Sequence, residues 1–216
     1  MNPDTNFTIR TFQGGYDKNL TYLITCSHSN AVILIDASIE FDLIKPFIKN
    51  NPIACLITHS HKDHIAYLES YLKQYPNLKI LAHSESNHLY NPNNFIPLDD
   101  YQNFKVGELK FIAMHTPGHY YDSICYKLNP LLFTGDTMFV GRTGRVVSSR
   151  SDIELMYDSI YNKILQLPKN IHIYPGHNYG HIPSITLQEN INCSPLLQAK
   201  NMDDFKNIMN EYEKNR

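Results

Sequence analysis

The chain has 216 residues, of which 42% are hydrophobic and 19% are charged, and its formal net charge is -2. This composition is typical of a globular protein, and the near-neutral charge favours neither nucleic acid nor a membrane surface as a partner. No apolar run approaches the roughly 20 residues that cross a bilayer. We expect one domain over residues 1–216, with a short helical C-terminal extension over about residues 183–216.

The first half of the chain alternates short apolar runs with turn residues. The runs predict strands over residues 7–12, 20–25, 31–36, 53–57 and 79–82. Apolar side chains at helical spacing predict helices over residues 42–50 and 65–75, and a helical turn over 84–90. Pro46 weakens the first of these helices, because proline removes a backbone donor.

The second half reads as two hairpins followed by helices. The hairpins are expected over residues 104–114 and 123–134, and one more strand over 171–174. A helix is predicted over residues 151–167, with a capping box formed by Ser151 and Glu154, and a last helix over 203–214. This order of strands and interleaved helices predicts a layered α/β fold.

Metal-capable side chains are most concentrated in one stretch, Thr58-His59-Ser60-His61-Lys62-Asp63-His64. It follows a buried strand and precedes a helix, which is where an α/β scaffold presents functional groups. Two histidines two residues apart project the same way from extended backbone, and the next two side chains turn away as the helix begins. The run can therefore serve two adjacent metal positions.

Three further loops follow strands and carry metal-capable residues. They are His115-Thr116-Pro117-Gly118-His119, Thr134-Gly135-Asp136-Thr137 and Gly176-His177-Asn178-Tyr179. Taken singly, each has an ordinary interpretation as a surface histidine or a capping aspartate. Together with the first motif they predict a metal site. The four scattered cysteines, without a Cys-x-x-Cys pair, predict free thiols and a cytoplasmic location.

With these four motifs in this order, the chain resembles the metallo-β-lactamase-fold hydrolases, specifically the glyoxalase II (hydroxyacylglutathione hydrolase) group. The resemblance implies a four-layer αββα sandwich with the metal site at the edge between the two sheets. It implies that His59, His61 and His115 hold one metal, that Asp63, His64 and His177 hold a second, and that Asp136 bridges both. It gives His119 a supporting role.

The chemistry of this set agrees with the resemblance. Five imidazoles and two carboxylates suit two divalent ions, with zinc as the first expectation and iron or manganese as alternatives. Two such ions lower the pKa of a shared water towards about 7 and so activate hydroxide. We expect Asp63 and Asp136 to be the catalytic carboxylates. A thiol with a pKa of about 8.5 leaves as thiolate, so the expected substrate is a small-molecule thioester of glutathione or a related thiol.

The resemblance also implies a substrate subsite. Arg145 and Tyr179 match a basic residue and a tyrosine that bind glutathione in the group. Val147 stands where another tyrosine is expected, and Gln198 where a basic residue is expected. Recognition of glutathione is therefore expected to be loose.

Three alternatives stay open at this stage. A persulfide dioxygenase resembles the chain closely and uses one iron at the positions of His59, His115 and Asp136. A broader hydrolase, acting on lactones or phosphodiesters, is the second. The third is a protein with a purely structural metal, which the large donor set disfavours because structural zinc sites are closed four-ligand cages. The oligomeric state, monomer or dimer, is left open.

Overall fold

The computed structural model describes residues 6–214. Strands of the first half are β1 (Phe7–Gly14), β2 (Asn19–Cys26), β3 (Val32–Ile35), β4 (Pro52–Leu56), β5 (Lys79–His83) and β6 (Phe95–Leu98). Those of the second half are β7 (Asn103–Val106), β8 (Leu109–His115), β9 (Ile124–Leu128), β10 (Leu131–Gly135), β11 (Met138–Phe139), β12 (Arg142–Thr143), β13 (His172–Pro175) and β14 (Ile185–Thr186). The α-helices are α1 (Phe41–Ile44), α2 (Leu68–Gln74), α3 (Ile153–Asp158), α4 (Leu187–Cys193) and α5 (Met202–Lys214).

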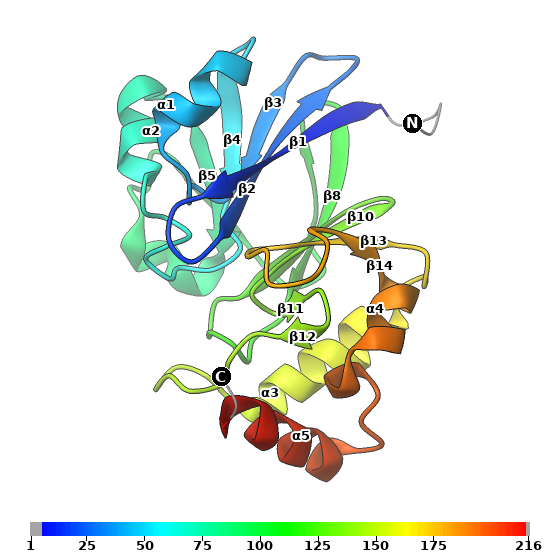
Figure 1. Cartoon of the computed structure of the whole chain (residues 1–216). Helices are drawn as coiled ribbons and strands as arrows, with labels where there is room; N and C mark the ends of the chain where they lie inside the picture. Colours follow the sequence, from blue (N-terminus) through cyan, green and yellow to red (C-terminus); the bar gives the residue numbers. More distant parts are fainter. Residues whose placement is uncertain (1–5, 215–216) are drawn as a thin grey trace.

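Two six-stranded sheets form the centre of the molecule. The first has the order β1-β2-β3-β4-β5-β6 and the second the order β14-β13-β10-β9-β8-β7, with β11 and β12 as a separate pair. Figure 1 shows α1 and α2 beside the first sheet at the upper left, and α3, α4 and α5 in the lower part of the molecule, on the side of the second sheet. The predicted four-layer αββα sandwich is confirmed.

The layers follow from the alternation of side chains along each strand. In β3, Ile33 and Ile35 belong to a core shared with β9 and β10 of the other sheet, whereas Val32 and Leu34 pack with α1 and α2. Successive side chains of a strand point to opposite faces, so a strand covered on both faces must be apolar throughout. This explains the unbroken apolar run at this position.

The outer layer of the second sheet comes from the end of the chain. Leu132 and Ile173 of the sheet pack with Met156 of α3, Leu187 of α4 and Phe205 of α5 in one buried cluster. Because α4 and α5 cover the sheet together with α3, the C-terminal segment is an integral part of this apolar layer.

Several predicted elements differ in detail from the structure. The helix expected over residues 151–167 continues beyond α3 as a π-helix (Ser159–Lys163) and a 3₁₀ turn (Ile164–Gln166). Asp152, and not Ser151, caps it, because the Asp152 side chain accepts hydrogen bonds from the backbone of Glu154 and Leu155.

Four short strands were not predicted, namely β6, β11, β12 and β14. Strand β6 contains a proline and lies at the edge of its sheet, where a missing backbone donor is tolerated. Strand β14 has only two residues. The helix expected over residues 42–50 ends early, as α1 followed by a 3₁₀ turn that contains Pro46.

The topology brings four loops to one edge of the sandwich. Strand β4 runs parallel to β3 and β5, and β10 runs parallel to β13, so the loops after β4, β10 and β13 leave at the carboxyl ends of parallel strands. Such ends are where open α/β sheets place functional groups. Within residues 6–214, no helix has the length and apolar character needed to span a membrane.

Candidate metal centre

The first donor group combines the loop after β4 with the loop after β8. His61 Nδ1 lies 2.9 Å from His59 Nε2 and 3.0 Å from His119 Nε2. The three ring nitrogens therefore converge within 4.8 Å of one another. This is the arrangement of three nitrogen ligands around one cation.

The second group lies beside the first. Asp63 Oδ2 is 3.4 Å from His64 Nε2 and 3.3 Å from His177 Nε2, and the two ring nitrogens are 3.3 Å apart. His64 is fully buried and His177 is 4% exposed, so bulk water has little access to these two rings. The loops after β4 and β13 meet here from opposite sheets.

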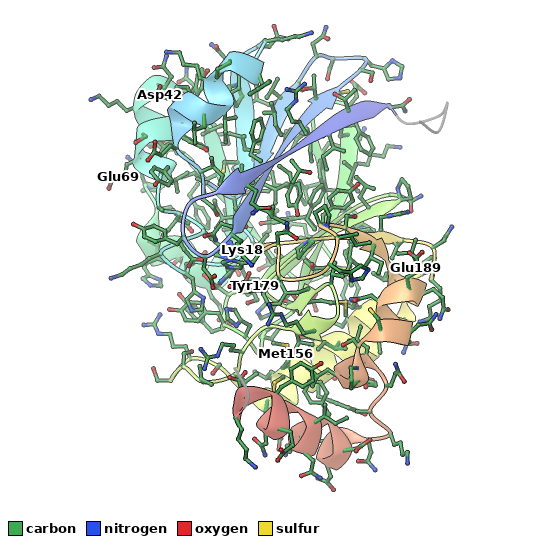
Figure 2. All side chains as sticks on the ribbon, viewed as in Figure 1. Lys18, Asp42, Glu69, Met156, Tyr179 and Glu189 are labelled. Atoms are coloured by element: carbon green, nitrogen blue, oxygen red, sulfur yellow. The ribbon has the colours of Figure 1, made fainter. Side chains whose placement is uncertain are left out.

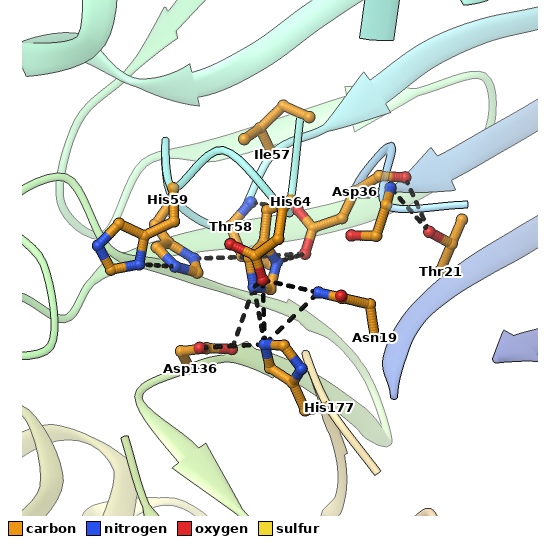
Figure 3. Close-up of polar contacts among 12 residues, drawn as sticks. Asn19, Thr21, Asp36, Ile57, Thr58, His59, His64, Asp136 and His177 are labelled. Atoms are coloured by element: carbon orange, nitrogen blue, oxygen red, sulfur yellow. Dashed lines mark hydrogen bonds and ion pairs between the residues drawn. The ribbon is translucent and has the colours of Figure 1, made fainter. Parts of the chain in front are cut away.

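Asp136, which directly follows β10, contacts both groups, and Figure 3 shows its contacts with His64 and His177 of the second group. Its Oδ1 lies 3.3 Å from His64 Nε2, and its Oδ2 lies 3.4 Å from His177 Nε2 and 3.5 Å from His119 Nε2. The side chain is buried, yet Oδ1 accepts no hydrogen bond from any residue that the structure describes. A buried carboxylate oxygen without a donor is costly unless a cation binds it, so the residues fit a metal.

In three histidines, the ring nitrogen that faces away from the cluster is hydrogen-bonded to a protein oxygen. His64 Nδ1 lies 2.8 Å from Asp36 Oδ2, His119 Nδ1 2.8 Å from the Arg145 carbonyl, and His177 Nδ1 2.9 Å from the Asp17 carbonyl. Each Nδ1–H can donate to its acceptor, which leaves Nε2 facing the cluster. This support is the usual way in which metal-binding imidazoles are oriented.

Asp36 supports the first motif as well as His64. The backbone of Thr58 donates to Asp36 Oδ1 at 2.7 Å, and the Thr58 hydroxyl donates to Asp36 Oδ2 at 2.8 Å. Both residues are buried, so these hydrogen bonds are shielded from water. Asp36 and Thr58 therefore fix the start of the loop that carries four of the seven donors.

The charges in the cluster also fit a cation. Burial, together with its histidine neighbours, lowers the pKa of His59, and burial and His119 lower the pKa of His61 to about 4. Both rings are thus neutral and ready to bind a metal. Burial alone would lower the pKa of His177, but its hydrogen bond to Asp136 raises it to about 9. In the metal-free protein a proton on this ring supplies the positive charge that the carboxylates require.

Sequence reasoning did not find Asn19 at the start of β2. Its side chain is fully buried, and Nδ2 donates to Asp63 Oδ2 at 2.9 Å and lies 3.5 Å from His177 Nε2. Asn19 follows a tight turn and lies 158 positions before His177, and no spacing rule connects the two. Only the pairing of the sheets reveals this contact.

Two glycines make room for the donors. A Cβ on Gly176 would lie 2.5 Å from Asp136 Oδ1 and 2.6 Å from His64 Cε1. Gly135 has a φ of +47°, and a Cβ there would lie 2.6 Å from the Thr58 side chain. Larger residues at either position would push the two sheets apart at the cluster.

His115 is the one predicted ligand that the structure does not bring to the cluster. Its ring stacks on His83 at 3.6 Å, and its Nε2 donates to the carbonyl of Tyr121 at 2.8 Å. His119 takes the expected place beside His59 and His61. The assignment of His115 is therefore corrected: this residue ends β8 and faces β5, whereas the Pro117-Gly118 turn carries His119 back over the donors.

A model of the metallo-β-lactamase superfamily matches residues 14–177, which hold all of these donors. The chain belongs to the metallo-β-lactamase superfamily. Among curated members of this superfamily, the chain is 35% identical over 175 residues to a hydroxyacylglutathione hydrolase of Francisella philomiragia, covering 79% of this chain and 67% of that one. It is 30% identical over 196 residues to a probable polyketide biosynthesis zinc-dependent hydrolase, BaeB, of Bacillus velezensis, covering 89% and 87%.

Solved structures of the superfamily agree with the fold. ETHE1 of Myxococcus xanthus superposes with a TM-score of 0.83 at 25% identity, covering 94% of this chain and 90% of that one. A metallo-β-lactamase of Staphylococcus aureus superposes with a TM-score of 0.84 at 25% identity, covering 95% and 67%. The two curated relatives support a hydrolase as the general class, and the superposed structures support the fold.

The residues expected to bind substrate lie next to the donors. A cavity of about 250 Å³ is lined by Asp17, His119, Asp136, Phe139, Arg142, Arg145 and Tyr179. Arg145 and Tyr179 thus line the same cavity. Neither Val147 nor Gln198 lines this cavity. Val147 is 61% exposed, and the Gln198 amide donates to the carbonyl of Ile191 in α4.

Proposed function

We propose that this protein is a binuclear metallohydrolase that cleaves thioesters of glutathione or a related thiol, with zinc as the first choice of metal. The observation that carries the proposal is the convergence of seven donors in two groups joined by Asp136. The donors are His59, His61 and His119 in one group, and Asp63, His64 and His177 in the other. A donor set of this size leaves positions for water and substrate, unlike a closed structural site.

The residues of the metal centre and their hydrogen-bonding neighbours have distinct roles in this reaction. When bound, two divalent ions supply a Lewis acid and a water whose pKa is lowered to about 7. Asp136 holds both donor groups together, and Asp63 is held in place by Asn19. Asp36 keeps His64 in the tautomer that presents Nε2 to the cluster. Together these contacts preorganise the site, so the donors need little rearrangement when substrate enters.

The cavity favours a leaving group that departs without protonation. Burial and the hydrogen bond to Asp17 raise the pKa of Tyr179, which makes its hydroxyl a weak acid. A thiol with a pKa of about 8.5 leaves as thiolate, whereas an amine or alkoxide needs a proton. A thioester therefore matches this cavity better than an amide. The names of the Francisella and Bacillus relatives support the same general chemistry.

The test combines metal analysis with two substrates. Protein loaded with zinc should hold two ions per chain and hydrolyse S-D-lactoylglutathione, seen as loss of thioester absorbance and appearance of free thiol. The rate should rise with pH over roughly 6–8 as the activated water ionises. Chelation should remove both metal and activity. Hydrolysis of lactones or phosphodiesters with no action on thioesters would contradict the proposal.

A second candidate, an iron-dependent persulfide dioxygenase, is favoured by one observation. His59 shares one donor group with His119 and another with Asp136, and His119 Nε2 lies 3.5 Å from Asp136 Oδ2, so two imidazoles and one carboxylate are neighbours. Two histidines and a carboxylate with open positions form the ligand set of non-haem iron oxygenases. One tightly held iron, together with oxygen uptake on glutathione persulfide and no thiol release from thioesters, would establish this function instead.

A further inference from the structure

The cavity beside the metal centre has one aromatic wall that carries two opposite charges. The Tyr179 ring stacks on His177, with ring centroids 4.8 Å apart and an interplanar angle of 4°. Its hydroxyl donates to Asp17 Oδ2 at 2.5 Å, and Phe139 packs against its ring at 5.0 Å. Tyr179 lies near the middle of the molecule, between the outer helical layers (Figure 2). The wall is therefore fixed relative to the donors.

Arg142 lies on this wall. Its guanidinium carbon is 4.2 Å from the centroid of the Tyr179 ring. Within residues 6–214 the guanidinium has no ion pair and no hydrogen bond, so its N–H groups remain available to a ligand. A guanidinium held over an aromatic ring is restricted in position, and its N–H groups can form two parallel hydrogen bonds to a carboxylate.

Arg145, the other arginine of the cavity, is already engaged. Its Nε donates to Glu213 Oε2 at 2.9 Å, which links the loop after β12 to α5. A substrate carboxylate that formed two hydrogen bonds with Nε and one terminal nitrogen of Arg145 would have to displace Glu213. Arg142 needs no such exchange, so it is the better anchor for an anion.

Asp17 supplies the complementary charge at the other end of Tyr179. One carboxylate oxygen accepts from the Tyr179 hydroxyl, and among the described residues Asp17 forms no ion pair. No ion pair joins Asp17 to Arg142, although both line the same cavity. A ligand with a carboxylate alone would satisfy Arg142 and leave Asp17 without a cation. A ligand with both charges satisfies both residues.

We propose that Arg142 and Asp17 form a subsite for a zwitterionic amino-acid head group, with the carboxylate on Arg142 and the ammonium on Asp17. The inference rests on the proposed function in assigning this head group to the thiol part of a thioester. It makes Arg142 and Asp17 the residues that determine selectivity, and it limits the substrate class to thiols that carry an amino-acid head.

The kinetic test compares acetyl thioesters of four thiols. These are glutathione, N-acetylglutathione, 3-mercaptopropionate and 2-mercaptoethanol, which carry both charges, carboxylates only, one carboxylate and no charge. Arg142→Ala should lower the ratio of kcat/KM for the glutathione thioester to that for the mercaptoethanol thioester at least ten-fold, mainly through KM. Asp17→Asn keeps an acceptor for the Tyr179 hydroxyl. It should remove only the preference for glutathione over N-acetylglutathione.

A matched control is Arg10→Ala. Arg10 also stacks on an aromatic ring, with its guanidinium carbon 4.2 Å from the centroid of Phe47, but it lies on β1 outside the cavity. This variant should leave the selectivity ratio unchanged. If Arg145→Ala carries the loss of selectivity instead of Arg142→Ala, the proposal is overturned. It is also overturned if Arg142→Ala slows all four thioesters equally.

A binding measurement separates this subsite from the proposed function. Calorimetric titration with S-methylglutathione, which has no thioester to hydrolyse, should show at least ten-fold weaker binding for Arg142→Ala and for Asp17→Asn. If this pattern holds while no thioester is cleaved, the subsite stands and the hydrolase assignment fails. If the unaltered protein does not bind S-methylglutathione, the subsite is wrong even where thioesters are hydrolysed.

Discussion

The seven donors differ in how directly their neighbours in the chain define their positions. His59, His61, Asp63 and His64 lie in one short loop, and the hydrogen bonds of Asp36 to Thr58 and His64 hold this loop in place. The partners that complete the cluster come from three other loops. His119, and not His115, has its ring among these donors, and the Pro117-Gly118 turn separates the two histidines.

This difference leads to the first prediction. His119→Asn should abolish binding at the first metal position or weaken it more than the roughly 10–100-fold that loss of a supporting hydrogen bond costs. His115→Asn is the matched control and should retain both ions, because its ring contacts His83 and a backbone carbonyl. Elemental analysis and competition with a zinc chelator measure the effect. Metal loss in His115→Asn with retention in His119→Asn would reverse the assignment.

At the level of elements, the His83–His115 stack joins the ends of β5 and β8, which belong to different sheets. Burial and the neighbouring His115 lower the pKa of His83 to about 4, while Asp99 and Asp100 act in the opposite direction. His83 is 5% exposed, so a proton on its ring would be poorly solvated. The contact therefore requires a neutral imidazole.

The stack should make stability depend on pH. The unfolded chain binds a proton at His83 near pH 6.5 and the folded chain only near pH 4, so protons favour unfolding between these values. The contribution of the neutral His83 ring to the free energy of unfolding is fully present above pH 6.5. It is lost as the pH falls towards 4, and the loss reaches up to about 3 kcal/mol. Urea unfolding of metal-free protein between pH 4.5 and 7 measures it. His83→Gln should flatten this dependence relative to the unaltered chain, and equal slopes in both proteins would refute the role of His83.

At the scale of the whole molecule, the donor cluster connects the two sheets. The first sheet supplies the loop after β4, and the second supplies His119, Asp136 and His177 (Figures 1 and 3). A metal that binds only this arrangement stabilises the folded state by mass action. The sandwich should therefore be more stable with metal than without it.

Zinc at 100 times its dissociation constant should stabilise the fold by about 2.7 kcal/mol. For a chain of 216 residues, this corresponds to a rise in Tm of roughly 5–11 °C. Thermal unfolding with zinc and with chelator measures the difference. His119→Asn should reduce the shift, whereas His28→Asn, at an exposed position, should not. An unchanged Tm on chelation would show that the metal does not couple the sheets.

Much of this protein could be predicted from local sequence. The strand-to-helix motif at residues 58–64, the hairpins and the apolar runs follow from side-chain periodicity and turn residues, which act over a few positions. Six of the seven donors in the cluster were identified in this way and through the family resemblance. The order of strands and helices predicted a layered α/β fold, and the family resemblance supplied the αββα order of its layers.

Other features were decided only by tertiary structure. Whether His115 or His119 faces the donors depends on the register of β8 and on the packing of His83 against it. The contact of Asn19 with Asp63 and the wall formed by Arg142, Tyr179 and Asp17 join residues far apart in the chain. The chemistry of single side chains and the periodicity of short segments are local properties, and the sequence by itself determined them. The pairing of two sheets is a long-range property, so the residues that complete and surround the site became apparent only in the folded molecule.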